Sequence, residues 1–309
     1  MTLIFEHDIC LEHDMGPGHP ERPDRLRAIQ LALAEPEFAS LERREAPLAD
    51  WSQVALVHPQ SYIDQVIATA PATGRVQLDP DTAMNPSTLE AAQRAVGAAC
   101  AAVDAVMGGD AKTAFCAVRP PGHHAEPERS MGFCIFNSVA IAAQHARAAH
   151  GLSRVAVVDF DVHHGNGTQA AFWDDADLFY GSTHQMPLYP GTGAASETGA
   201  GNIHNFPLPP GAAGLAFRDA CSDGLLPALE AFQPELLLLS AGFDAHENDP
   251  LAQLRLETSD YVWISEELLA LAGRHCQGRL VSSLEGGYDL GALVAATAAH
   301  VRALMTMGS

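Results

Sequence analysis

Near the middle of the chain the sequence reads Arg154-Val155-Ala156-Val157-Val158-Asp159-Phe160-Asp161-Val162-His163-His164. Residues 155–158 form an apolar run rich in β-branched side chains, the pattern of a parallel strand that is buried on both faces. Asp159, Asp161 and His163 then alternate with apolar residues, so in extended backbone their side chains point to the same side. Unpaired carboxylates at the end of a buried strand are costly, and a bound cation would relieve that cost. The stretch predicts a central strand that ends in a cation site.

Comparable apolar runs alternate with longer segments rich in alanine and leucine along the whole chain of 309 residues. We expect strands at residues 3–6, 113–118, 154–160, 178–183, 235–240 and 279–284. We expect helices at residues 23–34, 87–107, 137–150, 216–232, 259–272 and 290–305. This alternation is typical of an α/β fold in which helices cover both faces of a central, mostly parallel sheet. Because no linker, repeat or charge run divides the sequence, we interpret residues 1–309 as one domain.

The composition limits the classes of partner. The chain carries 17 basic and 38 acidic residues, a formal net charge of −21, so nucleic acid and anionic membranes are repelled and a cationic ligand fits better. An acidic surface that serves only solubility is the alternative explanation. The six cysteines include no C-x-x-C pair, which argues against a disulfide framework and against a thiolate zinc site. The first residues lack the features of a signal peptide and the apolar runs are strand-sized, so we expect a cytoplasmic protein.

Polar clusters follow four of the expected strands. They read Arg119-Pro120-Pro121-Gly122-His123-His124, Asp159-Phe160-Asp161-Val162-His163-His164, Ala241-Gly242-Phe243-Asp244 and Glu285-Gly286-Gly287-Tyr288. In open parallel sheets, ligands bind beyond the carboxyl ends of the strands. We therefore expect these four clusters to meet in one crevice.

Asp161, His163 and Asp244 are the candidate metal ligands. Asp161 and His163 come from one strand end, and Asp244 follows a second apolar run at residues 236–239. Two carboxylates and one imidazole leave an open coordination position, which is typical of catalytic rather than structural zinc, although iron(II) would also accept these ligands. Taken singly, Asp161 and Asp244 are equally suited to capping helices after strand–helix turns. Their combination with tandem histidines favours the metal site.

His123, His124 and Tyr288 are the candidates for proton transfer and charge stabilisation. The two histidines follow a Pro-Pro segment that restricts the backbone, and imidazole is well matched to proton transfer at neutral pH. Tyr288 follows two glycines at a strand end, a place from which its hydroxyl would be able to donate to an oxyanion. Each feature alone is also common in surface loops or packed cores, so the hypothesis depends on the combination.

Together the motifs resemble those of the histone deacetylase family, whose signatures are matched by the four clusters and by Tyr189-Pro190-Gly191-Thr192-Gly193. The resemblance covers nearly the whole chain. It is strongest to the class II branch and to bacterial histone deacetylase-like amidohydrolases, which are related to acetylpolyamine amidohydrolases, because Asn166 stands where class I enzymes usually carry aspartate. It implies a three-layer α/β/α arginase/deacetylase-like fold and a zinc-dependent deacetylase.

The resemblance also implies roles for the polar residues. A single catalytic zinc ion would be held by Asp161, His163 and Asp244, and it would polarise the substrate carbonyl and acidify a water molecule. The other catalytic assignments are His124 as general base and then acid, His123 braced by Asp159 as a source of positive charge, Tyr288 as donor to the oxyanion, and Asn166 as the residue that orients His124. Because an amide cannot stabilise an imidazolium as a carboxylate does, we expect a lowered pKa for His124.

Substrate-binding residues follow from the same resemblance. Family members line a narrow tunnel with aromatic residues, and Gly132, Phe133 and Tyr189 match those positions; such a tunnel favours an extended aliphatic stem. Asp81 resembles a rim carboxylate that binds the substrate backbone, although Asp-Pro and Asp-Thr are also ordinary turn sequences. Leu251 occupies the position where a polyamine-selective branch carries glutamate.

Two supporting sites rest on the resemblance alone. Arg22 looks like the arginine that holds the glycine turn before Tyr288, or else it caps the start of a helix. A structural potassium ion, K⁺, would be bound by Asp159, Asp161, the His163 carbonyl and a hydroxyl such as that of Ser182.

Hydrolysis of acetylated lysine is the leading hypothesis, and the tyrosine at position 288 supports it. Hydrolysis of acetylated polyamines is the alternative, and assembly into a homo-oligomer is compatible with either. A catalytically silent binding protein on the same fold is less consistent with the complete set of candidate ligands, histidines and tyrosine. A binuclear manganese hydrolase is disfavoured because further carboxylates are missing around Asp161 and Asp244.

Overall fold

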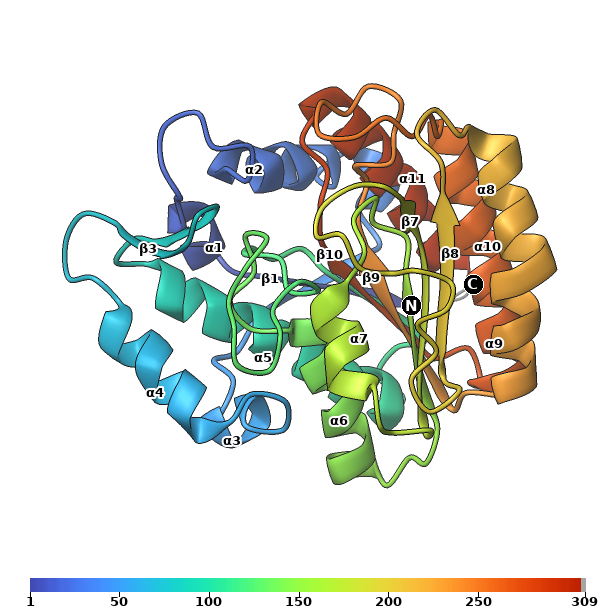
Figure 1. The fold of residues 1–309 in the computed structure, drawn as a ribbon, viewed down its shortest axis with the longest axis horizontal. Helices are drawn as coiled ribbons and strands as arrows, with labels where there is room; N and C mark the ends of the chain where they lie inside the picture. Colours follow the sequence, from blue (N-terminus) through green and yellow to red (C-terminus); the bar gives the residue numbers. More distant parts are fainter. Residues whose placement is uncertain (307–309) are drawn as a thin grey trace.

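An eight-stranded sheet runs through the middle of the molecule (Figure 1). The computed structural model describes residues 1–306. Across the sheet the strands lie in the order β2 (Glu42–Glu45), β1 (Thr2–Glu6), β5 (Thr113–Cys116), β10 (Leu280–Leu284), β9 (Leu236–Ala241), β6 (Val155–Asp159), β7 (Leu178–Gln185) and β8 (Ile203–Leu208). Each neighbouring pair is parallel. The predicted α/β fold class with a parallel central sheet is confirmed.

Helices cover both faces of this sheet, which gives three layers (Figure 1). One face carries α5 (Thr88–Gly108), α6 (Ser138–His150) and α7 (Asn166–Phe172), and the other carries α8 (Gly214–Ala220), α9 (Leu226–Phe232), α10 (Thr258–His275) and α11 (Leu290–Thr306). The smaller elements are α1 (Ile9–Glu12), α2 (Pro23–Ala32), a 3-10 turn (Pro36–Phe38), α3 (Trp51–Val54), α4 (Gln60–Thr69) and the antiparallel hairpin of β3 (Val76–Asp79) and β4 (Thr82–Met84). Among the described helices, none has the length and apolar character needed to cross a membrane.

The four central strands, β5, β10, β9 and β6, are buried along their whole length. The apolar runs in these strands suit a position between two helical layers, because side chains on both faces of the strand are shielded from water. The register places Val158 opposite Leu239 and Ser283 opposite Ser240. Since the strands are parallel and in close register, their carboxyl ends lie next to one another.

Two edge strands and one helix break differ from the sequence-based expectation. β2 has the sequence Glu-Arg-Arg-Glu and is mostly exposed, so no apolar pattern marks it. β8 contains Pro207, a residue that fits an edge strand because it donates no ladder hydrogen bond. The helix expected at residues 216–232 is divided into α8, a π-helical turn (Cys221–Leu225) and α9. Pro227 lacks the N–H that an α-helix would direct at residue 223, which accounts for the widened turn.

Candidate active site

The loops after β5, β10, β9 and β6 lie side by side, because these strands are neighbours in the sheet. They carry the four polar clusters of the sequence. Glu285 connects three of the loops: its buried carboxylate accepts hydrogen bonds from the backbone N–H groups of Gly122 and His123 at 2.7 and 3.2 Å and from the Ser240 hydroxyl at 3.0 Å. The structure therefore brings the clusters together in one crevice, as expected.

Asp161, His163 and Asp244 converge on one point of this crevice. Nδ1 of His163 lies 3.2 Å from Oδ1 of Asp161 and 3.1 Å from Oδ2 of Asp244, and one atom from each of the three side chains lies within 4.8 Å of the others. Backbone N–H groups fix both carboxylates: Gly286 donates to Asp161 at 2.8 Å, and Val162 donates to Asp244 at 2.9 Å. The backbone thus holds the two carboxylates in place, and His163 contacts both of them.

Glycine is required next to these carboxylates. A Cβ at Gly286 would lie 2.1 Å from Oδ2 of Asp244, and a Cβ at Gly242 would lie 2.1 Å from Oδ2 of Asp161. Both distances are far below van der Waals contact. Any larger residue at either position would displace a carboxylate from the cluster.

This cluster fits a divalent cation. Asp161 and Asp244 are buried, and among residues 1–306 only histidines form ion pairs with them. Burial by itself disfavours a charged imidazole, yet hydrogen bonds and charges from the two carboxylates raise the pKa of His163 to about 10. Two carboxylates and one imidazole are a donor set suited to a metal ion that keeps an open coordination position. His163 also lines a cavity, so that position would be accessible from it.

His123 is held against Asp159. Its Nδ1 lies 2.9 Å from Oδ2 of Asp159, and the hydroxyl of Tyr180 donates to the same oxygen at 3.1 Å. Burial alone would lower the pKa of His123, but the carboxylates of Asp159, Asp161 and Glu285 raise it well above 6.5. His123 is therefore a protonated, positively charged side chain at neutral pH.

His124 is held by an amide instead of a carboxylate. Its Nδ1 lies 2.8 Å from Oδ1 of Asn166, and Nδ2 of Asn166 donates to Oε1 of Glu126 at 2.7 Å. Because a carboxylate only accepts, Glu126 fixes which end of the amide faces the ring. The amide oxygen then requires a hydrogen on Nδ1 of His124, which leaves Nε2 of the neutral ring with a free lone pair.

The charge state of His124 agrees with that arrangement. Burial, followed by the positive charges of His123 and His163, holds the pKa of His124 well below its usual value of 6.5. The two neighbouring rings, whose centroids lie 4.0 Å apart, therefore differ: His123 carries a charge and His124 is neutral. Such a split provides one electrostatic group and one base in a single site.

Tyr288 faces the same cavity and is supported from two sides. Oδ2 of Asp249 accepts a hydrogen bond from the Tyr288 backbone N–H at 2.7 Å. The guanidinium of Arg25 lies over the tyrosine ring, 4.8 Å from its centroid. Burial raises the pKa of Tyr288 well above 10, so its hydroxyl stays protonated and able to donate.

Arg25, and not Arg22, holds the glycine turn before Tyr288. Nε of Arg25 donates to the Gly287 carbonyl at 2.6 Å, and Nη2 donates to the Glu285 carbonyl at 2.5 Å. The side chain of Arg22 is 47% exposed and pairs with Asp24 at 3.5 Å. The expectation that Arg22 holds the turn is wrong, because Arg25 lies on the buried face of α2. Arg22 instead occupies the N-cap position of this helix, the alternative drawn from the sequence, although its side chain makes no capping hydrogen bond.

A fully buried ionic network lies behind the turn. Glu21 accepts a hydrogen bond from Nη1 of Arg25 at 3.0 Å, and its two carboxylate oxygens accept from Nε and Nη2 of Arg119. Nε2 of His13 lies 3.3 Å from the Glu21 carboxylate. Arg119 belongs to one of the four polar clusters of the sequence, but its contact with Glu21 joins residues 98 positions apart and left no local signal.

The cavity in front of these groups has a volume of about 190 Å³. It is lined by Asp81, His124, Gly132, Phe133, His163, Leu188, Tyr189, Leu251 and Tyr288. The rings of Phe133 and Tyr288 meet edge to face with centroids 5.9 Å apart, and those of His124 and Tyr189 do so at 5.2 Å. All five residues expected to bind substrate lie here, together with Leu188, which the sequence motifs did not mark.

The turn at Gly132 and Phe133 shapes one wall of this cavity. Both residues have positive φ angles, of +56° and +67°, and a Cβ at Gly132 would lie 2.4 Å from the His124 ring. Asp81 accepts a hydrogen bond from the Gly132 N–H at 3.1 Å. One oxygen of this carboxylate is thus used to hold the turn.

Comparisons with known proteins agree with this geometry. Residues 19–304 match the sequence model of the histone deacetylase domain. The chain is 39% identical to "Histone deacetylase 14, chloroplastic" of Arabidopsis thaliana, over 98% of this chain and 76% of that protein. It is 38% identical to "Histone deacetylase-like amidohydrolase" of Pseudomonas aeruginosa, over 93% of this chain and 82% of that protein. Its structure matches the crystal structure of the HDA15 HD domain with a TM-score of 0.94 at 34% identity, covering 99% of this chain and 88% of that one.

Proposed function

Since the chain belongs to the histone deacetylase family, we propose that it is a zinc-dependent amide hydrolase that removes acetyl groups from lysine side chains. The observation that carries the proposal is the shared lining of one cavity. Three groups line the same cavity of about 190 Å³: the neutral imidazole of His124 with its free Nε2, the protonated hydroxyl of Tyr288, and the imidazole of His163 from the candidate metal cluster. An amide carbonyl placed there would meet a base, a hydrogen-bond donor and a cation site together.

Asp161, His163 and Asp244 are the residues that would hold the zinc ion. The chemistry that zinc supplies when bound is Lewis acidity toward the amide carbonyl and toward the attacking water. Iron(II) is compatible with the same ligands, so the metal used in the cell is part of the proposal.

His124 performs the proton transfers. Its Nε2 accepts a proton as water attacks the carbonyl carbon, and the imidazolium then gives that proton to the amine nitrogen as the carbon–nitrogen bond breaks. The second proton of the attacking water leaves the acetic acid and ends on the amine, so the products are acetate and an ammonium group. His123 with Asp159 provides a fixed positive charge beside the reacting groups, and Asn166 keeps the His124 ring in the required orientation.

Tyr288 stabilises the oxygen on which negative charge develops. Its hydroxyl donates a hydrogen bond to that oxygen, and the raised pKa ensures that the proton is present. Asp249 and Arg25 hold the tyrosine backbone and the preceding turn, so the donor is placed before the substrate arrives.

The cavity wall favours an aliphatic chain next to the amide. Phe133, Tyr189 and Leu251 supply apolar surface that suits the methylene stem of lysine. Acetylated polyamine is the second candidate substrate, favoured by the net charge of −21 and by Asp81 at the cavity. Leu251 provides no carboxylate to pair with a distal ammonium, which favours the lysine substrate.

The direct test is a rate comparison on protein of known metal content. An acetyl-lysine peptide and acetylated putrescine and spermidine are hydrolysed side by side, with Tyr288→Phe as control. Preference for the peptide that depends on Tyr288 supports the proposal. Preference for polyamines moves the function to small amines, and no hydrolysis of any acyl amine by zinc-loaded protein contradicts both.

Other sequence-based expectations stay predictions. One of these is a single catalytic domain over residues 1–309, and another is a cytoplasmic location. A third is a structural potassium ion near Asp159 and Ser182, which are register partners in β6 and β7; the Ser182 hydroxyl is bonded to Nδ1 of His184 at 2.9 Å.

A further inference from the structure

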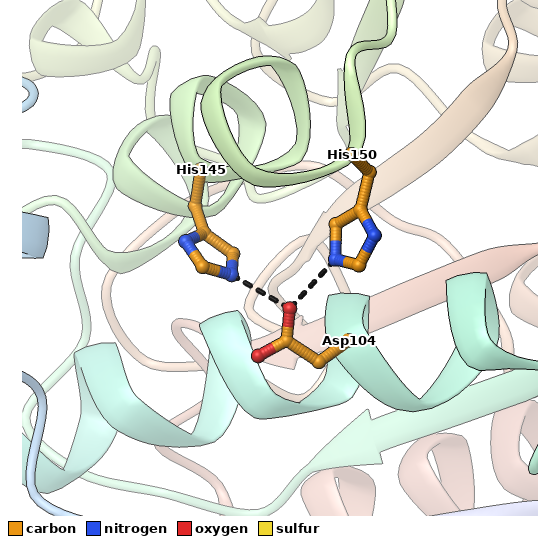
Figure 2. A group of neighbouring side chains, drawn as sticks. All are labelled: Asp104, His145 and His150. Atoms are coloured by element: carbon orange, nitrogen blue, oxygen red, sulfur yellow. Dashed lines mark hydrogen bonds and ion pairs between the residues drawn. The ribbon is translucent and has the colours of Figure 1, made fainter.

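A second cluster of metal-binding side chains lies between two helices. Asp104 comes from α5, and His145 and His150 come from α6 (Figure 2). Nε2 of His145 lies 2.8 Å from Oδ1 of Asp104, and Nε2 of His150 lies 2.7 Å from the same oxygen. Figure 2 shows both rings pointing at this one atom from the same helix.

The cluster is remote from the candidate active site. α6 ends at His150 and leads into the start of β6, whereas the active-site groups follow the end of β6. Asp104 likewise lies near the end of α5, which leads into the start of β5. The two clusters therefore lie at opposite ends of the strands, one at their amino ends and the other at their carboxyl ends, and they share no residue.

The backbone holds the three side chains in place. α5 and α6 pack against each other, and both helices are rich in small buried residues, such as Ala98 and Ala102 in α5 and Ala142 in α6. The side chain of His145 is only 11% exposed, which restricts its rotamer, and His150 precedes Gly151, which ends the helix in a left-handed conformation. An ion bound here would need little reordering of the chain.

The donor atoms suit a late first-row transition metal. Two imidazole nitrogens and one carboxylate oxygen are ligands that Zn²⁺, Ni²⁺, Cu²⁺ and Co²⁺ accept, whereas Mg²⁺ and Ca²⁺ require mostly oxygen. The three atoms lie within 4.8 Å of one another, as do those of Asp161, His163 and Asp244. In a tetrahedral site with bonds of about 2.0–2.1 Å, ligand atoms lie about 3.3 Å apart, so each ring would move outward by about half an ångström.

We propose that Asp104, His145 and His150 form a second, surface site for a divalent transition-metal ion, with water completing the coordination. The side chain of Asp104 is 51% exposed, so the ion has direct access from solvent. Binding replaces the two hydrogen bonds to Oδ1 with coordinate bonds and connects α5 to α6 through the ion. The proposal does not depend on the reaction at the active site.

The experiment is a measurement of metal stoichiometry on the intact protein. Protein already carrying one equivalent of zinc is dialysed against buffered Zn²⁺ or Co²⁺, and bound metal is quantified together with the visible absorption of Co²⁺. We expect a second equivalent in the unaltered protein, and its loss in His150→Ala and in Asp104→Asn. Both altered positions are partly exposed, so folding is retained, and circular dichroism verifies this.

A matched control comes from another histidine–carboxylate pair on the surface. Nε2 of His275 lies 2.7 Å from Glu230, with no second histidine at that carboxylate within the described residues. His275→Ala should keep the second equivalent. A single equivalent in the unaltered protein, or a second one that persists in His150→Ala and Asp104→Asn, would overturn the proposal and leave the cluster as a hydrogen-bonded link between helices.

Discussion

Asn166 presents its amide oxygen to Nδ1 of His124 at 2.8 Å while its amide nitrogen is bound to Glu126. The neutral amide of Asn166 thus separates His124 from the nearest carboxylate on this side, that of Glu126. Burial and the positive charge of His123 lower the pKa of His124, and the neutral amide of Asn166 adds no negative charge that would offset them. This relationship defines a first experiment.

Asn166→Asp places a carboxylate directly against His124 and should raise its pKa. Because the neutral ring is the active base, a higher pKa means that activity is lost at a higher pH; we expect the acid limb of kcat/KM to move up by about one pH unit. The pH profile of kcat/KM measures this. Since the introduced carboxylate would face Glu126, the double variant Asn166→Asp/Glu126→Gln is measured as well, and an unchanged limb in both contradicts the role given to His124.

Tyr288→Phe removes the proposed donor to the developing oxyanion. Loss of one such donor lowers kcat by about 10²–10³-fold, with little change in KM, because the bond forms mainly in the transition state. Steady-state kinetics on an acetyl-lysine peptide separate the two constants. Tyr189→Phe deletes a hydroxyl from the same cavity at a side chain that is 38% exposed, and it should cost far less. Equal losses in both variants would argue against a specific role for Tyr288.

Arg25→Ala should be strongly destabilising, and Arg22→Ala should not. Arg25 is fully buried, and its removal leaves two backbone carbonyls without their donor and takes one of two arginines from the buried Glu21 carboxylate, at a cost of about 3–5 kcal/mol. Arg22 is half exposed, and its removal should change stability by less than about 0.5 kcal/mol. Urea unfolding of both variants, three positions apart in the chain, gives the comparison. A similar loss in both would mean that Arg25 is not the residue that supports the turn.

Glu21 should make the fold sensitive to acid. Burial alone would raise the pKa of Glu21, but Arg119 and His13 hold it well below 4.5. A carboxyl whose pKa is depressed in the folded state stabilises the fold above its ordinary pKa, and that contribution is lost as the pH falls through the folded pKa. The free energy of unfolding should therefore decline below about pH 4.5, and less steeply in Glu21→Gln. Identical slopes for the two proteins would remove Glu21 as the cause.

Leu251→Glu tests what selects between the two candidate substrates. A carboxylate at this cavity wall would pair with a distal ammonium, and we expect kcat/KM for acetylated spermidine to rise about fivefold relative to the peptide, as for one partly exposed ion pair. Leu251→Gln has the same shape without the charge and should leave the ratio near its original value. A rise in both variants would point to loss of apolar surface instead of to charge.

The sequence predicted the centre of the fold better than its edges. β6 and β9 are apolar runs with a plain boundary, because strands covered on both faces have no polar alternation to obscure them. β2 is an edge strand of four charged residues whose strand partner is β1, and this pairing leaves no local pattern. β8 was missed because Pro207 lies within it, and a proline inside a run of residues argues against a strand.

The metal cluster and the histidines were accessible from the sequence because each motif is short and directly follows a strand. Arg25 was missed since Arg22 lies only three positions before it, and only the helical phase of α2 decides which of the two faces inward. Glu126 was missed because its contact runs across the fold, from the loop after β5 to the start of α7. Contacts of that kind depend on how loops fold back, which no local periodicity encodes.

The position of β10 in the sheet has a consequence for synthesis of the protein. β10 is the last strand in the chain, yet it lies between β5 and β9 in the centre. Until residues 280–284 leave the ribosome, the strands made earlier form two separate groups, β2-β1-β5 and β9-β6-β7-β8, each with an unpaired inner edge that is prone to aggregation. Insertion of β10 closes both edges and delivers Tyr288 to the crevice in the same event. Closure of the sheet and completion of the crevice are thus coupled, because both depend on the placement of a single strand.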